Sequence, residues 1–150
     1  MRYITPLVLA SLFGLPGLSF ASRSVTEYWD DAKTKAKSVQ VFDDQGRQTG
    51  EWIIWYENGQ MKSKSSFLHG EQLLFESWFD NGEKEIQEPF AEGMPHGLWI
   101  WWGANGKILA KSFFMMGTGT EYYFNSDETI RRKVIWVSGV RVSELLPPFN

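Results

Sequence analysis

The stretch GEWIIWYENG at residues 50–59 returns with few changes as GLWIWWGANG at residues 97–106. Between the two copies, WFDNG at residues 78–82 repeats the second half of the pattern, WYENG at residues 55–59. A second landmark, an aromatic residue followed three positions later by glycine, occurs at Phe67/Gly70, Phe90/Gly93, Phe114/Gly117 and Trp136/Gly139. Because both landmarks keep one period of 22–24 residues, the sequence predicts a repeat architecture.

Each repeat predicts a β-hairpin. Residues 51–57 are rich in the Trp, Ile and Tyr side chains that strands favour, and residues 60–67 form the return strand. Asn58-Gly59 between them predicts a type I′ turn, in which both central residues have positive φ. Asn81-Gly82 and Asn105-Gly106 predict the same turn in later units. Because single hairpins are unstable in water, we predict an all-β fold of stacked antiparallel hairpin repeats that form an elongated, twisted single-layer sheet.

The predicted organisation has four parts. Residues 1–21 read as a signal peptide, with Arg2 before the apolar stretch Leu7 to Leu18 and cleavage after Ala21. Residues 22–40 form an N-terminal capping segment, residues 41–139 hold about four repeat units, and residues 140–150 are a C-terminal tail. The first turn is expected near Gln45-Gly46, and in the divergent last unit Ser126-Asp127-Glu128 replaces Asn-Gly.

Composition narrows the function. Aromatic residues make up 16% of the 150 residues and include eight Trp, which suits stacked strands. A net charge of -3 gives no support to a nucleic-acid partner. Cysteine is absent, which excludes disulfides and thiol catalysis. After removal of the signal peptide we expect no transmembrane segment, and the predicted location is the periplasm or the cell exterior.

The pattern Gly-x-Trp-x-x-Trp-aromatic-x-Asn-Gly, followed by Phe-x-x-Gly, resembles the bacterial MORN-type repeat, in the variant found in YwqK-family antitoxin components. The resemblance covers about residues 41–139 and is closest at 50–70 and 97–117. It implies a sheet used as a scaffold for protein or lipid binding, with no catalytic residues to carry over. The antitoxin label implies a cytoplasmic protein that neutralises a partner, whereas the leader of this chain favours an immunity-like role in the envelope.

The tryptophan-rich strands are the main candidates for binding. Trp52 and Ile54 should share one face of a strand, while Ile53 and Trp55 take the other. Either the sheet curls or is covered by the N-terminal segment and the ELLPPF tail, or one face stays open as a binding surface. The candidate binding residues are Trp55, Trp78 and Trp102, which repeat in register, together with Trp52, Trp99 and Tyr56.

Other polar groups give weaker signals. Arg131, Arg132 and Lys133 are either a charged edge strand or a contact for anionic surfaces. His69 and His96 each precede a glycine and are read as turn residues, so no metal site is predicted. The acidic pairs 30–31 and 43–44 are read as solvated loop residues. No catalytic motif is present, and neither catalytic residues nor a cofactor are predicted.

These observations favour an exported, non-enzymatic scaffold that binds a protein partner. The alternative is a module that binds glycan, peptidoglycan or lipid with the tryptophan row. A small envelope hydrolase would need a pocket with convergent carboxylates, and no spacing in the sequence requires one.

Overall fold

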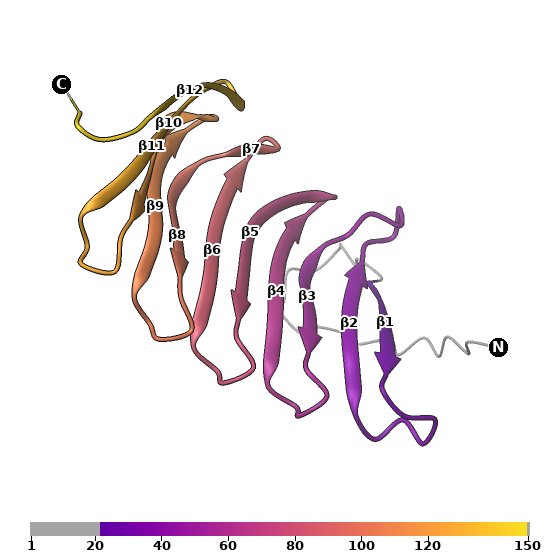
Figure 1. Cartoon of the computed structure of the whole chain (residues 1–150). Helices are drawn as coiled ribbons and strands as arrows, with labels where there is room; N and C mark the ends of the chain where they lie inside the picture. The colour runs from indigo at the N-terminus through magenta and orange to yellow at the C-terminus, as the bar shows by residue number, and fades with distance from the viewer. Residues whose placement is uncertain (1–21, 150) are drawn as a thin grey trace.

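The computed structural model describes residues 22–149, which form one antiparallel sheet in a single layer (Figure 1). The predicted all-β fold of stacked hairpins is therefore confirmed. The strands are β1 (Arg23–Tyr28), β2 (Ala36–Phe42), β3 (Gly50–Trp55), β4 (Met61–Leu68), β5 (Glu71–Trp78), β6 (Lys84–Ala91), β7 (Met94–Pro95), β8 (Gly97–Trp102), β9 (Ile108–Met115), β10 (Thr118–Phe124), β11 (Ile130–Val137) and β12 (Val140–Leu145).

The strands follow one another across the sheet in chain order, except that the two-residue strand β7 pairs only with β6. The predicted signal peptide lies outside the described residues. β1 and β2 occupy the segment predicted as an N-terminal cap, and they form a hairpin at one edge of the sheet. Within residues 22–149 no helix has the length and apolarity needed to cross a bilayer.

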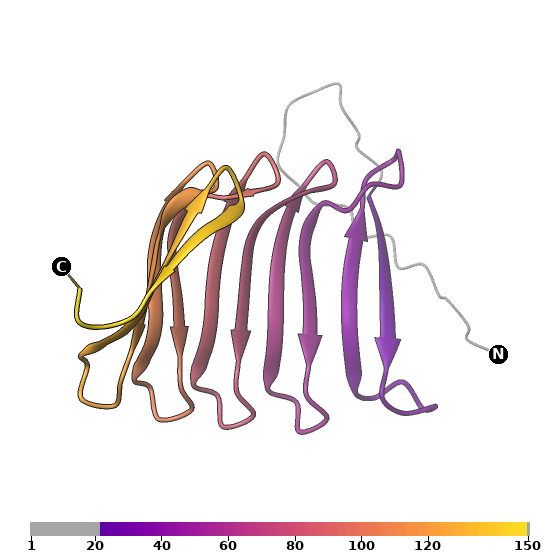
Figure 2. The ribbon, with the colours of Figure 1, turned by 45° about the horizontal axis from the view of Figure 1, so that its top comes forward.

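The Asn-Gly loops lie where they were predicted, in a row at one end of the sheet (Figure 2), but the predicted turn type is wrong. Gly59 has a φ of 88°, whereas Asn58 does not have a positive φ. The amide of Gly59 donates to the carbonyl of Tyr56 (3.0 Å), and the amide of Tyr56 donates to the carbonyl of Gln60 (2.8 Å). This is a three-residue loop, a type I turn followed by a left-handed glycine. The Asn58 side chain stabilises it by accepting a bond from the Gln60 amide (3.0 Å).

Turns with two positive φ angles occur at the opposite end of the sheet, at His69-Gly70, Glu92-Gly93, Met116-Gly117 and Ser138-Gly139. Neighbouring turns at this end are joined by backbone hydrogen bonds. The amide of Gly117 donates to the carbonyl of Pro95 (2.7 Å), and the amide of Gly139 donates to the carbonyl of Gly117 (3.0 Å). The repeats are therefore stacked through their turns as well as through their strands.

The two faces of the sheet differ sharply. Strand register places Trp52 opposite Ser65, Trp99 opposite Ser112, and Ser112 opposite Glu121, all on one side that we call the packed face. Lys64, Glu76, Ile100, Lys111 and Phe113 point to the other side, the open face. All buried side chains of the described residues except that of Glu76 lie on the packed face.

The packed face buries surface without a second layer because large side chains lie beside small ones. Trp99 stands between Phe90 and Phe114, with ring centroids 5.2 Å apart in both edge-to-face contacts. The Phe114 ring covers Gly119, where an added Cβ would come within 2.7 Å of the ring. Each aromatic pair contributes about 0.5–1.5 kcal/mol beyond its buried area.

Candidate binding surfaces

The predicted tryptophan row sits at irregular positions of the sheet. Trp55, Trp78 and Trp102 are the last residues of β3, β5 and β8, and each lies at a shift in strand register. All three are half-buried. A bulge at this position turns the strand into the Asn-Gly loop, so the repeating tryptophan marks the point where each strand leaves the ladder.

Two tryptophans of the row meet at a lysine on the open face. The Lys84 Nζ lies 5.8 Å from the centre of the Trp78 ring and 5.9 Å from that of Trp102. It also donates to Glu76 (2.6 Å), which accepts a second ion pair from Lys64 (3.1 Å). Burial raises the pKa of Glu76, but the bonds from the two lysines outweigh it, and the net pKa lies below its usual value. Lys64 also lies 3.7 Å from Glu51, so each charged group of the cluster has an ionic partner, and the arrangement is that of a structural clamp.

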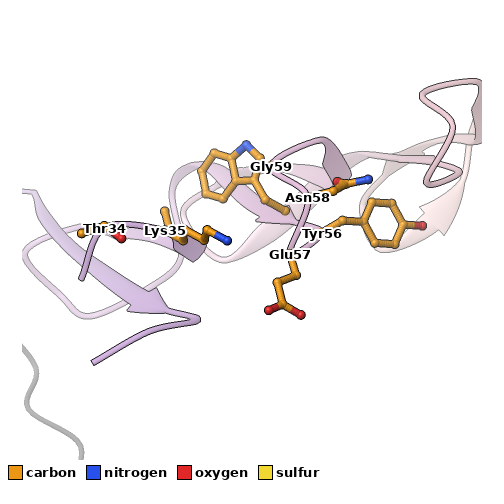
Figure 3. Close-up of a pocket in the computed structure, with 8 residues that line it drawn as sticks. Thr34, Lys35, Tyr56, Glu57, Asn58 and Gly59 are labelled. Atoms are coloured by element: carbon orange, nitrogen blue, oxygen red, sulfur yellow. The ribbon is translucent and has the colours of Figure 1, made fainter. Parts of the chain in front are cut away.

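Trp55 lies apart from that clamp and lines a pocket of about 390 Å³. Thr34, Lys35 and Ala36 form one side, and residues 55–59 form the other (Figure 3). The pocket exists because the ladder between β2 and β3 contains only two residue pairs, Ser38–Ile54 and Val39–Ile53. Past those pairs the two strands separate towards the loops.

The pocket combines an indole with charged and amide groups. Lys35 and Glu57 supply opposite charges on its two sides. The Asn58 amide is engaged by the loops, because its oxygen accepts from the Gln60 amide (3.0 Å) and its nitrogen donates to the carbonyl of Asp80 (3.4 Å). The Tyr56 hydroxyl is already engaged, because it donates to the carbonyl of Trp78 (2.9 Å). Burial raises the pKa of Tyr56, followed by the effect of nearby Glu85 and Asp80. A small amphipathic molecule that stacks on the indole and makes polar contacts at its rim fits this chemistry.

Trp52 and Trp99, the other predicted binding tryptophans, belong to the packed face. The Trp99 indole donates to the carbonyl of Pro89 (2.7 Å) and packs in the aromatic ladder. Trp52 lies across from Ser65, which is buried. Their surroundings are those of structural residues.

The basic run does not form one cationic surface. Arg132 and Lys133 point to opposite faces, since they pair with Tyr123 and Tyr122 respectively. Arg132 lies over the Tyr123 ring at 3.8 Å and pairs with Glu144 at 3.3 Å. Lys133 lies 4.2 Å from the centre of the Phe149 ring. Arg131, which precedes both in the sequence, is exposed, whereas Arg132 and Lys133 contact different neighbours on opposite faces.

The histidines and acidic pairs stabilise turns. The His96 Nδ1 accepts a bond from the Met116 amide (3.3 Å), and His69 lies 3.5 Å from Asp43. Asp43 also accepts from the Arg47 amide and guanidinium. Asp30 accepts from the side chain and amide of Thr34, and these bonds, the side-chain one above all, lower its pKa. Within residues 22–149, no group of three or more possible ligands is placed to hold a metal ion.

Sequence reasoning missed an exposed apolar surface on β8 and β9. On the open face, Leu98 pairs directly with Phe113, and Met115 lies two residues further along the same strand. Phe113 is 62% exposed and Met115 is 64% exposed. We call these three residues the β8–β9 patch. The signal was present in Phe113-Phe114, because adjacent phenylalanines in a strand point to opposite faces and only Phe114 belongs to the repeat landmark.

Comparison with known families supports the repeat assignment. Residues 48–69 and 95–115 match the MORN repeat variant. Both stretches are similar to this repeat. The matched segments contain the hairpins β3–β4 and β8–β9. The hairpin between them, β5–β6, has the same register shift at its tryptophan and the same loop without matching the family model. No curated protein matches the chain.

Proposed function

We propose that this chain is an exported, non-enzymatic scaffold that binds a protein partner through the open face of its sheet. MORN-type repeats indicate a module for protein or membrane interaction. The observation that carries the proposal is the β8–β9 patch, in which Phe113 and Met115 remain more than 60% exposed on a continuous strand ladder. Export rests on the signal-peptide pattern of residues 1–21.

The patch has the character of a protein interface. Its apolar centre is held by backbone hydrogen bonds on both sides of β9, so it loses little conformational freedom on binding. The exposed Lys111 lies on the same face beside Phe113, which gives an apolar centre with a polar rim. A large apolar side chain fixed on a rigid element is a typical energetic anchor of protein recognition.

The effect of this chain on its partner is inferred from the rigid sheet and from the signal-peptide pattern. A rigid sheet that covers a surface of its partner can block that surface without a catalysed reaction. An exported chain would do this to a protein of the cell envelope. An immunity-like role is therefore our proposal for the consequence of binding.

The test is co-purification of the tagged chain from the envelope of its host, with mild crosslinking and mass spectrometry. We expect one stoichiometric protein partner that is lost with Phe113→Asp. Leu68→Asp is the matched control, because Leu68 is also an exposed apolar residue (52%) but lies at the far end of β4. Retention of the same partner by Phe113→Asp, with an unchanged melting temperature, would refute the proposal.

The pocket beside Trp55 favours a second candidate function, the binding of a saccharide ring. Sugar rings have an apolar face for the indole and hydroxyl groups for Lys35 and Glu57. This reading predicts that the chain sediments with isolated cell wall and that Trp55→Ala releases it, while Trp78→Ala, outside the pocket, does not. Folding of both variants is checked by circular dichroism. Equal retention of Trp55→Ala would exclude the pocket as a glycan site.

A further inference from the structure

Three loops in the row at one end of the sheet (Figure 2) carry an exposed asparagine followed by glycine, at Asn58, Asn81 and Asn105. Such a pair can react with itself. The glycine nitrogen attacks the asparagine Cγ and closes a five-membered imide, while the side-chain nitrogen leaves as ammonia and takes the proton of the glycine amide. Water then opens the imide to aspartate or isoaspartate. Because the two reacting atoms must approach within about 3.5 Å, the structure of each loop sets the rate.

Within each loop the reacting groups are held in the same way. The glycine amide donates to the carbonyl three residues earlier, at 2.9–3.0 Å. The asparagine Oδ1 accepts a bond from the amide two residues later, at 3.0–3.1 Å. Both bonds engage groups that must move before the imide forms. Since all three loops share them, these bonds do not distinguish the sites.

The bonds between neighbouring loops do distinguish the sites. The Asn58 Nδ2 donates to the carbonyl of Asp80 (3.4 Å), and the Asn81 Nδ2 donates to the carbonyl of Ala104 (3.1 Å). The next loop therefore holds each of these two side-chain amides in place. In the part of the chain that the structure describes, the only hydrogen bond of the Asn105 side chain is the one that its Oδ1 accepts. Its leaving nitrogen is not held.

The first residue of the loop gives a second difference. The other two loops begin with Tyr56 and Phe79, which are half-buried aromatic residues. The Tyr56 hydroxyl also donates to a backbone carbonyl of the neighbouring strand β5 (2.9 Å). The loop around Asn105 begins with Gly103, which has no side chain to pack and has more backbone freedom. This loop therefore opens more readily than the other two.

We propose that Asn105 is a deamidation site of the folded chain and is converted to aspartate or isoaspartate ahead of Asn58 and Asn81. Water is the only co-reactant, and ammonia is the only other product. The reaction places a carboxylate in a loop that Glu83 already borders, since a Cβ on Gly106 would lie 3.9 Å from the Glu83 Oε2. Isoaspartate also lengthens the main chain of the loop by one methylene group.

This inference goes beyond the proposed function and does not depend on it. The Asn105 loop joins β8 and β9 at one end of their hairpin, whereas Met115 of the β8–β9 patch is the last residue of β9 at the other end. Loss of the proposed partner and loss of the Asn105 amide are therefore separate results.

The experiment incubates the purified full chain in mildly alkaline buffer at physiological temperature and follows the three asparagine peptides by mass spectrometry after proteolysis. Replacement of NH₂ by OH raises the mass of a peptide, and chromatography separates isoaspartate from aspartate. We expect Asn105 to react about five-fold faster than Asn58 or Asn81, which is the factor that one net hydrogen bond contributes. The control is the same chain unfolded in guanidinium chloride. There we expect equal rates, because glycine follows each asparagine.

Two variants test the aromatic residue at the start of the loop. Tyr56→Gly gives the Asn58 loop the first residue of the Asn105 loop, and we expect Asn58 to react faster while Asn81 keeps its rate. Tyr56→Phe retains the ring and should leave Asn58 slow. Circular dichroism checks that both variants are folded. The proposal is overturned if Asn105 is not the fastest site of the folded wild type, if its preference persists in the unfolded chain, or if folded Tyr56→Gly leaves the Asn58 rate unchanged.

Discussion

Replacement of Gly117 by alanine tests the stacking of turns along the array. Gly117 is the second residue of the Met116-Gly117 turn and has a φ of 74°. A Cβ at this position would lie 2.5 Å from the backbone nitrogen of Gly139 and 3.1 Å from its Cα. Gly139 occupies the same position of the next turn with a φ of 78°, and a Cβ there would meet no atom within 4 Å. Alanine would therefore be strained by a similar φ at both positions, but only at Gly117 would its Cβ also collide with neighbouring backbone atoms.

The magnitudes follow from that difference. An alanine in the left-handed region costs about 1–2 kcal/mol, and both variants lose this amount. Gly117→Ala must also push away the backbone of the β11–β12 turn, which adds about 1–3 kcal/mol for overpacking. It also weakens the bond from the Gly139 amide to the Gly117 carbonyl. For a domain of this size, 1 kcal/mol corresponds to about 4 °C in melting temperature.

The assay is thermal unfolding of the two variants and the wild type, followed by circular dichroism and calorimetry. We expect Gly139→Ala to melt about 4–8 °C below the wild type and Gly117→Ala about 8–20 °C below it. Equal losses in the two variants would show that neighbouring turns do not press on each other. The stacked arrangement of the turns would then be refuted, although the hairpins themselves would stand.

Further predictions concern the two faces and the loops. Trp99→Ala should cost about 3–5 kcal/mol in chemical denaturation because it opens the aromatic ladder, whereas Phe113→Ala should cost less than about 1 kcal/mol. Glu76→Gln should lower stability at pH 7 by about 1 kcal/mol, since both lysines are partly exposed. Because folding lowers the pKa of Glu76, that loss should begin to shrink below about pH 4.5 and vanish as the pH falls through the lowered folded-state pKa. Glu88→Gln should do the reverse: burial raises the pKa of Glu88, with Glu121 adding to the rise, so the variant should melt higher at pH 7 and equal the wild type near pH 4. Glu128 has a φ of 66° where the three Asn-Gly loops have Gly59, Gly82 and Gly106, and Glu128→Gly should stabilise the chain by up to about 1 kcal/mol in denaturant titrations.

The repeat period and the hairpins could be predicted because they depend on local signals. Asn-Gly marks a change of direction wherever it occurs, so the position of each loop was correct. The turn type was not, because a left-handed glycine also fits the three-residue loop. The turns with two positive φ angles contain His69, Glu92, Met116 and Ser138, which do not favour that conformation. In three of these turns the glycine amide donates to a backbone carbonyl of the neighbouring unit, and such bonds are not visible in the sequence of a single unit.

The exposed surface could not be predicted because it depends on strand register. Alternation assigned Trp52 and Ile54 to one face and Ile53 to the other, in agreement with the pairing. It did not show which face would be covered. That depends on small residues of the neighbouring strand, such as Ser77 beside Ile86 and Ser112 beside Trp99. The register of the strands determines which serine lies beside each tryptophan, and that register cannot be read from one strand alone.

This alignment separates stability from recognition. In a single layer each face must supply its own burial, and the packed face does so by pairing large side chains with small ones from neighbouring strands. The open face is held mainly by backbone hydrogen bonds and by the Lys64–Glu76–Lys84 clamp, so Phe113 and Met115 can change at little cost to the fold. The aromatic residues that define the repeat, such as Trp99 and Phe114, pack within the sheet and are not available for a partner. The residues available for binding a partner are those that the repeat pattern does not fix. Variation at residues 98, 113 and 115 should therefore change which partner binds. Variation at residues 99 and 114 should instead change the stability of the fold.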